Sequence, residues 1–215
     1  MLLEEQRRQV IETAREALQT GLIMLTTGNF SLRDPETGYM CITPSGMDYQ
    51  QVTPADIVVM DTKGTIIDGD RKPSIEGSLH RFAYEKRPDI FGVCHSHSPY
   101  ATAWASVEEP FPLIVAELAG MLGSNLMTAP FFPMGSMELA EVTIRVLGNQ
   151  NAVLMSNHGQ LTVGPSLPKA LAHARLIEEA AKIACFAKSI GTPRIISEEK
   201  AESLKKWLAT HYGQQ

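Results

Sequence analysis

Four residues of this chain have side chains that commonly bind divalent metal ions. His95 and His97 follow an apolar run at positions 90–94. Successive side chains of a strand point to opposite faces, so these two imidazoles emerge on the same side and can bind one ion. His158 offers a third imidazole and Glu76 a carboxylate. Three neutral nitrogens and one displaceable oxygen predict an open metal site suited to catalysis.

Each of these residues also has a simpler interpretation. Two strand histidines can be satisfied by backbone carbonyls, His158 precedes a glycine and can be a turn residue, and an acid such as Glu76 favours a helix start. The four together favour a metal site over these separate roles. The other histidines fall on expected helices or in the tail and are left out of the metal shell: His80, His173 and His211.

Composition narrows the class of protein. The chain has 215 residues, of which 44% are hydrophobic, so it can bury a substantial core, and we expect one domain spanning residues 1–215. A net charge of −5 without a basic stripe argues against a nucleic-acid partner. Three scattered cysteines, no hydrophobic signal core and no membrane-length apolar run predict a cytoplasmic protein without membrane contact.

The elements that must position these residues are a mixed set of strands and helices. Apolar periodicity and turn residues predict strands at 39–42, 57–60, 65–67, 90–94 and 152–155, and the turn at 26–31 leads into a further expected strand. Helices are expected at 4–18, 78–86, 100–105, 138–147, 166–187 and 198–208. Strands cluster early and helices dominate late, which predicts a mixed sheet covered by helices. No dinucleotide or P-loop motif is present.

Five short motifs, taken in order, resemble a known family. They are Gly28-Asn29-Phe30-Ser31, Thr43-Pro44-Ser45-Gly46, Pro73-Ser74-Ile75-Glu76, His95-Ser96-His97 and Asn157-His158-Gly159. In this order they resemble the class II aldolase/adducin head-domain family. The closest branch is that of L-fuculose-phosphate aldolase and related deoxy-sugar phosphate aldolases.

The resemblance implies an α/β/α three-layer sandwich on a central, largely antiparallel mixed sheet. It also implies a homotetramer with active sites near the subunit interfaces. His95, His97 and His158 would be zinc ligands, although imidazole and carboxylate also suit Mn²⁺ or Co²⁺. Glu76 would be both a resting-state metal ligand and the catalytic acid/base.

The resemblance further implies a phosphate pocket. Its residues would be Gly28, Asn29, Ser45, Gly46 and Ser74. Several family members carry a second serine where this chain has Ile75, which removes one side-chain donor to the phosphate. The family's aromatic proton donor is best matched by Tyr212, because Ala116 and Glu117 stand where a tyrosine would otherwise be sought.

The implied reaction is cleavage of a ketose 1-phosphate, such as L-fuculose 1-phosphate, into dihydroxyacetone phosphate and a small aldehyde. Breaking a carbon–carbon bond beside a carbonyl produces an enediolate, whose charge a divalent ion stabilises as a Lewis acid. Two other activities of the family stay open: L-ribulose-5-phosphate 4-epimerase, whose members tend to carry aspartate in place of Glu76, and methylthioribulose-1-phosphate dehydratase. A non-enzymatic alternative is an adducin-like binding module.

Overall fold

The computed structural model describes residues 1–213 and places an eight-stranded sheet at the centre of the molecule. In chain order the strands are β1 Asn29–Arg33, β2 Met40–Ile42, β3 Val58–Met60, β4 Ile66–Asp68, β5 Gly92–Ser96, β6 Thr128–Ala129, β7 Ala152–Met155 and β8 Gly159–Gly164. Their order across the sheet is β4-β3-β2-β1-β5-β8-β7-β6. Every neighbouring pair is antiparallel except β6 with β7. The expected largely antiparallel mixed sheet is confirmed.

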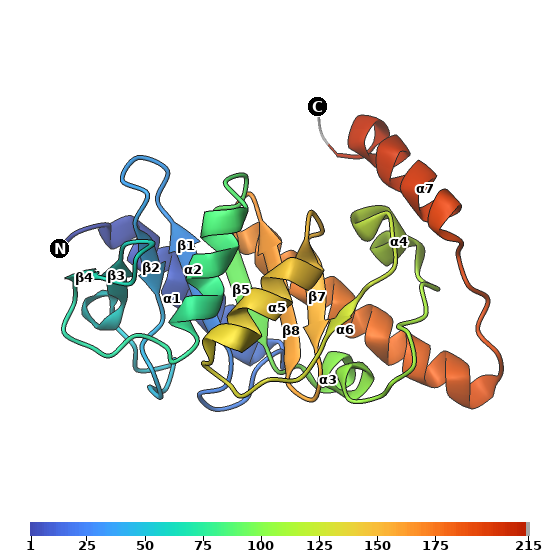
Figure 1. The fold of residues 1–215 in the computed structure, drawn as a ribbon, viewed down its shortest axis with the longest axis horizontal. Coiled ribbons are helices and arrows are strands. Elements are labelled where there is room, and N and C mark those ends of the chain that lie inside the picture. Colours follow the sequence, from blue (N-terminus) through green and yellow to red (C-terminus); the bar gives the residue numbers. More distant parts are fainter. Residues whose placement is uncertain (214–215) are drawn as a thin grey trace.

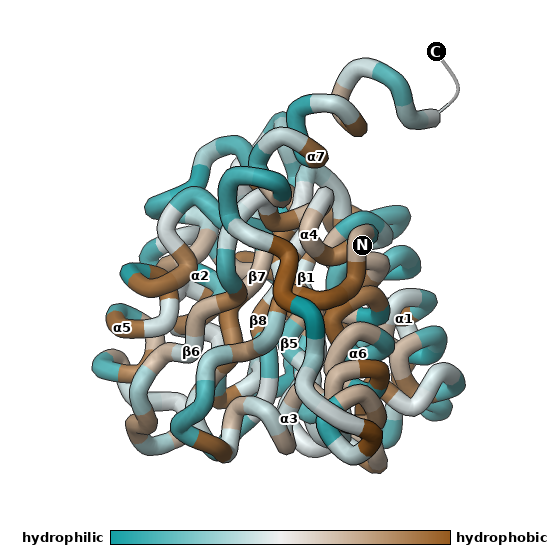
Figure 2. The backbone as a smooth tube through the Cα atoms, turned by 90° about the vertical axis from the view of Figure 1, so that its right-hand side faces the viewer, coloured by the Kyte–Doolittle hydropathy of each residue, from teal (hydrophilic) through white to brown (hydrophobic). Residues whose placement is uncertain are grey.

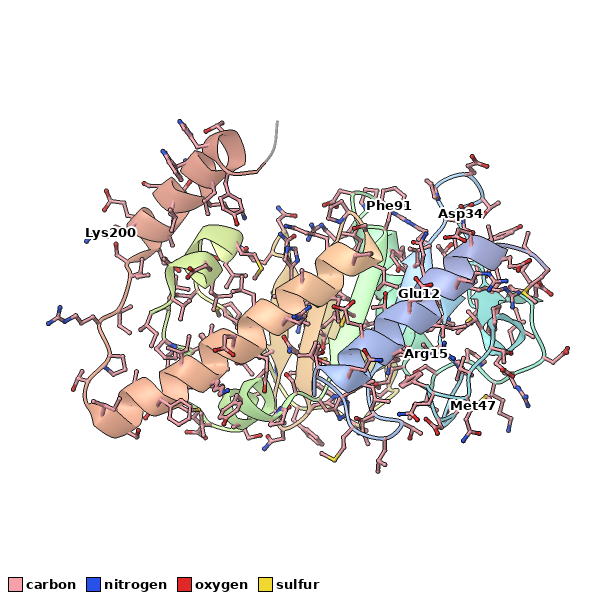
Figure 3. All side chains as sticks on the ribbon, turned by 180° about the vertical axis from the view of Figure 1, so that it is seen from behind. Glu12, Arg15, Asp34, Met47, Phe91 and Lys200 are labelled. Carbon is pink, nitrogen blue, oxygen red and sulfur yellow. The ribbon has the colours of Figure 1, made fainter. Side chains whose placement is uncertain are left out.

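Helices cover both faces of this sheet, as Figure 1 shows. They are α1 Glu4–Gln19, α2 Gly77–Lys86, α3 Pro99–Ala105, α4 Ala116–Leu122, α5 Met137–Leu147, α6 Leu167–Ile190 and α7 Glu198–His211, with a 3₁₀ turn η1 at Pro54–Asp56. The helices α2 and α5 lie in front of the sheet in Figure 1, and the view from behind in Figure 3 shows α1 and α6 across the opposite face. The fold is therefore the α/β/α sandwich that the sequence predicts.

The alternation of strand side chains divides the interior into two cores. On β1 and β5, Phe30 and Cys94 pack with α1 and α6. Val93, the neighbour of Cys94, instead packs in the core formed with α2 and α5. Since side chains alternate, His95 projects toward the α2 side, opposite Cys94. Cys94 is thus a buried core residue on the face of β5 opposite His95.

A third core joins α3, α4, α6 and α7 beyond the β6 edge of the sheet. The close approach of α7 to α4 depends on Gly120, where an added Cβ would lie 2.3 Å from the Leu208 side chain. Figure 2 shows hydrophobic segments gathered between the layers and hydrophilic segments along the outer turns. Within residues 1–213, no helix combines the length and apolar character needed to cross a bilayer.

Among the described helices and strands, three were not predicted from the sequence. They are α4, β6 and β8. The strand β8 begins at Gly159, directly after the turn that carries His158, and pairs with both β5 and β7. Among the described residues, five of the eight strands precede residue 97 and five of the seven helices begin after it, as expected, although β8 joins the sheet beside β5 from the second half of the chain.

Candidate metal centre

The register of the sheet brings an expected phosphate-pocket residue beside an expected metal ligand. Asn29 on β1 lies directly opposite His95 on β5. The loop that leads into β1 turns at Gly28, which has a left-handed backbone with φ +74°. A Cβ added at this position would lie 2.7 Å from the carbonyl oxygen of His95. Only glycine allows both this backbone conformation and this close approach. The loop before β1 is thereby held against the end of β5.

The other ligands arrive from two turns. His158 lies in the β7–β8 connection after Asn157, which has a left-handed backbone with φ 55°. Asparagine tolerates this conformation better than most residues. Glu76 is the N-cap residue of α2 and is 5% exposed. Helix start, strand end and hairpin turn thus converge on the α2 side of the sheet.

The four expected metal ligands form one cluster. One ligand atom from each of Glu76, His95, His97 and His158 can be chosen so that all lie within 4.8 Å of one another. The three imidazole rings are 4.7 to 4.8 Å apart between centroids. The Nε2 atoms of His95 and His97 are 2.8 Å apart. The carboxylate of Glu76 lies 3.2 Å from His95 Nε2 and 3.3 Å from His158 Nε2.

Two features of this cluster fit a bound cation. Among the described residues, Glu76 Oε1 and both ring nitrogens of His158 are buried without a hydrogen-bond partner, which is costly unless another group binds them. His95 Nδ1 lies 2.9 Å from the carbonyl oxygen of Gln160 and donates its hydrogen there, which leaves the Nε2 lone pair facing the cluster. The donor set of three nitrogens and a carboxylate suits Zn²⁺ and related ions.

The surroundings set the charge of these groups. Burial raises the pKa of Glu76, but the charge and hydrogen bond of His95, with smaller contributions from His158 and Asn29, outweigh it and hold the pKa well below its ordinary value. Burial and repulsion from neighbouring rings lower the pKa to about 3 for His97 and about 4 for His158. Burial lowers the pKa of His95, but the Glu76 carboxylate outweighs it and raises the pKa. At neutral pH the site thus offers the carboxylate of Glu76 and the neutral imidazoles of His97 and His158.

The residues expected to hold a phosphate lie on three segments that meet beside Glu76. An isolated bridge joins Pro44 to Pro73. The backbone N–H of Ser45 donates to the carbonyl of Lys72 over 2.9 Å, and that of Ser74 donates to the carbonyl of Thr43 over 3.0 Å. The segment at 28–30 joins them, because the backbone N–H of Thr43 donates to the carbonyl of Phe30 over 3.1 Å.

Within this group the side chains differ in accessibility. Ser45 and Gly46 are exposed, whereas Gly28, Asn29 and Ser74 are buried. Gly46 has φ +67° and open space where a Cβ would stand. A glycine turn with exposed backbone N–H groups is a common way to hold an anion.

Tyr212 does not reach this cluster within its own chain. It is 81% exposed and follows the end of α7. Figure 1 shows that chain end above α4, on the edge of the molecule away from α3, the helix that follows the two histidines. The alternative positions, Ala116 and Glu117, begin α4.

Comparison with known proteins assigns the family. The model of the Class II Aldolase and Adducin N-terminal domain matches residues 8–185. The chain belongs to this family. It is 36% identical over its full 215 residues to the 5-deoxy-D-ribulose 1-phosphate aldolase of Bacillus thuringiensis serovar kurstaki, also over that protein's full length. It is 34% identical over 194 residues to the L-fuculose phosphate aldolase of Escherichia coli K12, covering 90% of this chain and 89% of that one.

A solved structure agrees. The fold matches that of an L-fuculose 1-phosphate aldolase with a TM-score of 0.92 and 33% identity, over 95% of this chain and 96% of the other. As a class II aldolase the chain is an enzyme, a carbon–carbon lyase, and the adducin-like alternative is set aside. The family is metal-dependent, and the cluster of Glu76 with three histidines is its candidate metal-binding site here.

Sequence reasoning missed one group of buried residues beside the site. His80 is fully buried on α2 and contacts Asn29, Ser31 and, through Ser31, Tyr84. The sequence interpretation gave His80 an ordinary helical role. The spacing of Glu76, His80 and Tyr84 was the available signal, because residues four apart share one face of a helix.

Proposed function

We propose that this enzyme is a zinc-dependent aldolase that cleaves a deoxy-ketose 1-phosphate into dihydroxyacetone phosphate and a small aldehyde. The observation that carries the proposal is the convergence of Glu76, His95, His97 and His158 within 4.8 Å. Two relatives named for deoxy-sugar phosphates support this substrate class. Both named sugars end in a methyl group, so the aldehyde fragment would be acetaldehyde or lactaldehyde.

The substrate phosphate would bind where the loops of Gly28, Ser45 and Ser74 meet. The N–H groups of Ser45 and Ser74 already donate to the carbonyls of Lys72 and Thr43, so other backbone N–H groups of these loops and the small hydroxyls would hold the phosphate. Ile75 is 65% exposed and offers no hydroxyl. Phosphate binding would therefore depend on the backbone and on the remaining side-chain donors.

His95, His97 and His158 would hold the cation, with Glu76 as the fourth and displaceable ligand. When bound, the ion supplies Lewis-acid stabilisation of the negative charge that develops beside the ketose carbonyl. The loops of Gly28, Ser45 and Ser74 would hold the phosphate end of the sugar. The buried carboxylate of Glu76 lies beside the three histidines, where it would transfer a proton.

In the proposed cleavage, one carbon–carbon bond breaks and one proton moves from oxygen to carbon. The bond between C3 and C4 breaks, the C4 hydroxyl loses its proton, and C4 becomes the aldehyde carbon. The electron pair of the broken bond remains with the three-carbon fragment as an enediolate. The proton lost from the C4 hydroxyl would pass by way of Tyr212 to the Glu76 carboxylate, and Glu76 would deliver it to C3. Tyr212 would exchange the proton at the C4 oxygen, and because it is exposed at the end of α7, it would come from a neighbouring subunit.

Further proposals concern the assembly and its location. We infer a homotetramer with active sites near its interfaces. Exposed apolar side chains support association, since large apolar residues on a surface often mark contacts; they include Leu25, Ile190 and Trp207. A reducing cytoplasm would suit the three free cysteines.

The test is a product-resolved assay. Metal-loaded protein is incubated separately with 5-deoxyribulose 1-phosphate, L-fuculose 1-phosphate, L-ribulose 5-phosphate and methylthioribulose 1-phosphate, and the products are identified by NMR. We expect dihydroxyacetone phosphate and an aldehyde from one or both of the first two. An epimer as the main product would make the protein an epimerase, and a dehydrated ketone would make it a dehydratase.

A further inference from the structure

Four buried polar side chains form a continuous row of hydrogen bonds that runs from Ser31 through His80 and Asn29 to Glu76. The Nδ2 atom of Asn29 donates to Glu76 Oε2 over 2.8 Å. His80 Nε2 lies 2.6 Å from Asn29 Oδ1, and His80 Nδ1 lies 2.6 Å from Ser31 Oγ. The hydroxyl of Tyr84 lies 2.9 Å from Ser31 Oγ and also donates to the carbonyl of Ser31 over 2.9 Å.

The chemistry of the groups fixes the direction of this row. A carboxylate only accepts hydrogen bonds, so the amide nitrogen of Asn29 faces Glu76 and its oxygen faces His80. That oxygen needs a donor, so His80 carries its hydrogen on Nε2. Burial, with repulsion from His95, lowers the pKa of His80 to about 3, so the ring is neutral and Nδ1 has a lone pair. Ser31 therefore donates to Nδ1, and the donors of Ser31, His80 and Asn29 all point toward Glu76.

The opposite arrangement is unfavourable at each contact. A hydrogen on Nδ1 would leave the lone pair of His80 Nε2 facing the amide oxygen of Asn29. Rotating the Asn29 amide to relieve this would turn its oxygen onto the Glu76 carboxylate. These residues are at most 5% exposed, so bulk water cannot readily replace the lost bonds.

The row treats the two oxygens of Glu76 differently. Oε2 receives the hydrogen bond from Asn29 and lies 3.2 Å from His95 Nε2, whereas Oε1 has no hydrogen-bond partner among the described residues and lies 3.3 Å from His158 Nε2. Both oxygens thus face the cluster, and Asn29 anchors only Oε2. Asn29 also keeps a second amide hydrogen for another acceptor.

We propose that His80 is a positioning residue of this enzyme: by fixing the amide orientation of Asn29, it holds Glu76 in the geometry needed for proton transfer. The inference rests on the proposed aldolase function, because it assigns Glu76 the proton transfer. His80 touches neither substrate nor cation. Its contribution is to keep one carboxylate oxygen fixed while the other exchanges partners.

Three variants separate this role from simple core packing. The amide nitrogen of glutamine can occupy the place of a histidine Nε2, so His80→Gln keeps a donor toward Asn29. The amide of asparagine reaches only the Nδ1 position, so His80→Asn keeps a partner for Ser31 and loses the donor to Asn29. His80→Leu loses both. The control is His173→Gln, since His173 is another buried helical histidine and bonds only the carbonyl of Val163 in this structure.

We expect kcat of the leucine and asparagine variants to fall roughly 10- to 100-fold, the usual effect of removing a group that supports a metal ligand. KM and zinc content should stay near wild-type values, and His80→Gln should recover most of kcat. The His173→Gln variant should keep wild-type kcat. Wild-type kcat in His80→Leu, or equal losses in the glutamine and leucine variants at equal thermal stability, would overturn the proposal.

Neutron diffraction from deuterated wild-type crystals gives a readout that does not depend on activity or on a variant folding. Deuterium should be found on His80 Nε2, with the ND₂ group of Asn29 directed at Glu76. Deuterium on Nδ1 instead would overturn the proposal. A different result would refute the proposed aldolase function alone: no cleavage of any ketose 1-phosphate by the wild-type enzyme, with deuterium found on His80 Nε2 as expected.

Discussion

At the scale of single residues, the members of the candidate metal cluster have different tasks. The three imidazoles provide lone pairs, and Glu76 provides an oxygen that can leave. These tasks respond differently to substitution, because loss of an imidazole removes a metal ligand, whereas replacing the carboxylate by an amide removes the proton carrier.

Replacing Glu76 and replacing His95 should therefore have distinct results. Glu76→Gln keeps the shape and the hydrogen bond from Asn29 but cannot carry the proton, so we expect most of the zinc to remain and kcat to fall by about 10²-fold or more. His95→Ala should instead leave less than about a tenth of the zinc, because a central ligand is lost. Metal analysis and steady-state kinetics on the same preparations check both, and wild-type turnover in Glu76→Gln would contradict the assignment.

At the scale of elements, close contacts between backbones position the site. The strand β5 approaches the start of α6 at Gly92, where an added Cβ would lie 2.3 Å from Leu167 Cα and 2.4 Å from its nitrogen. Neither atom can move away as a flexible side chain would. The contact therefore fixes how far the strand carrying His95 lies from the helix behind it.

Gly92→Ala should lower the free energy of unfolding by about 3 kcal/mol or more, because overpacking against backbone forces the strand and helix apart. Gly191→Ala is the matched control: it follows α6, has extended φ of 174° and meets nothing within 4 Å, so its effect should stay within about 0.5 kcal/mol. Urea unfolding of the metal-free proteins measures both. Equal stability of the two variants would show that the backbones are less tightly held than described.

A capping carboxylate gives a pH-dependent test of another element. Asp56 accepts hydrogen bonds from the N–H and hydroxyl of Thr53 and from Arg71. The hydrogen bond from the Thr53 hydroxyl is the main cause of its lowered pKa, and it outweighs burial. A pKa that is lower in the folded state gives stability above the unfolded value and loses it as pH falls through the folded value.

The variant Asp56→Asn should accordingly be less stable than wild type by about 1 kcal/mol at pH 7. The difference should shrink below about pH 4, where the wild-type carboxylate gains its proton. Urea unfolding of both metal-free proteins at several pH values measures this. A difference that grows as the pH falls would have the wrong sign.

Much of the fold and the candidate cluster could be predicted from local sequence signals. The helix α1 and the strands β2, β3 and β7 have regular apolar patterns. The elements β6 and α4 were missed because they are short, with two and seven residues. The strand β8 was missed because it begins with Gly159. A glycine after Asn157-His158 indicates a turn, and only the pairing with β5 shows that a strand begins there.

The four expected ligands come together as predicted, since short motifs indicated each of them. The row of hydrogen bonds from Ser31 to Glu76 could not be predicted as easily. It depends on which strand residues face α2, and this follows from the pairing of β1 with β5 rather than from either segment alone. Tyr212 stays a prediction, because its partner atoms would belong to another chain.

At the scale of the whole molecule, we propose that residues 1–215 form one domain on one continuous sheet, and that four such chains make the complete enzyme. The end of α7 lies on the edge away from α3 in Figure 1. An aromatic residue there can serve an active site only across a subunit interface. The proposed tetramer and the proposed role of Tyr212 are thus linked.

Subunit mixing tests that link. Tyr212→Phe and Glu76→Gln chains should each be nearly inactive as pure assemblies. Mixed in equal amounts, dissociated and reassembled, they should regain on the order of a quarter of wild-type activity, since about one site in four combines an intact Glu76 with an intact neighbouring Tyr212. Light scattering verifies the assembly, and activity no greater than the average of the two pure variants would contradict a shared site.

The central claim is that one cation held by Glu76 and three histidines is needed to split a ketose phosphate. The most direct measurement is the rate of dihydroxyacetone phosphate release from the cleaved substrate as zinc is added to metal-free protein. The account predicts no cleavage without metal and a rate that rises in proportion to bound zinc until each chain holds about one ion. Full cleavage by metal-free protein in the presence of a chelator would contradict it.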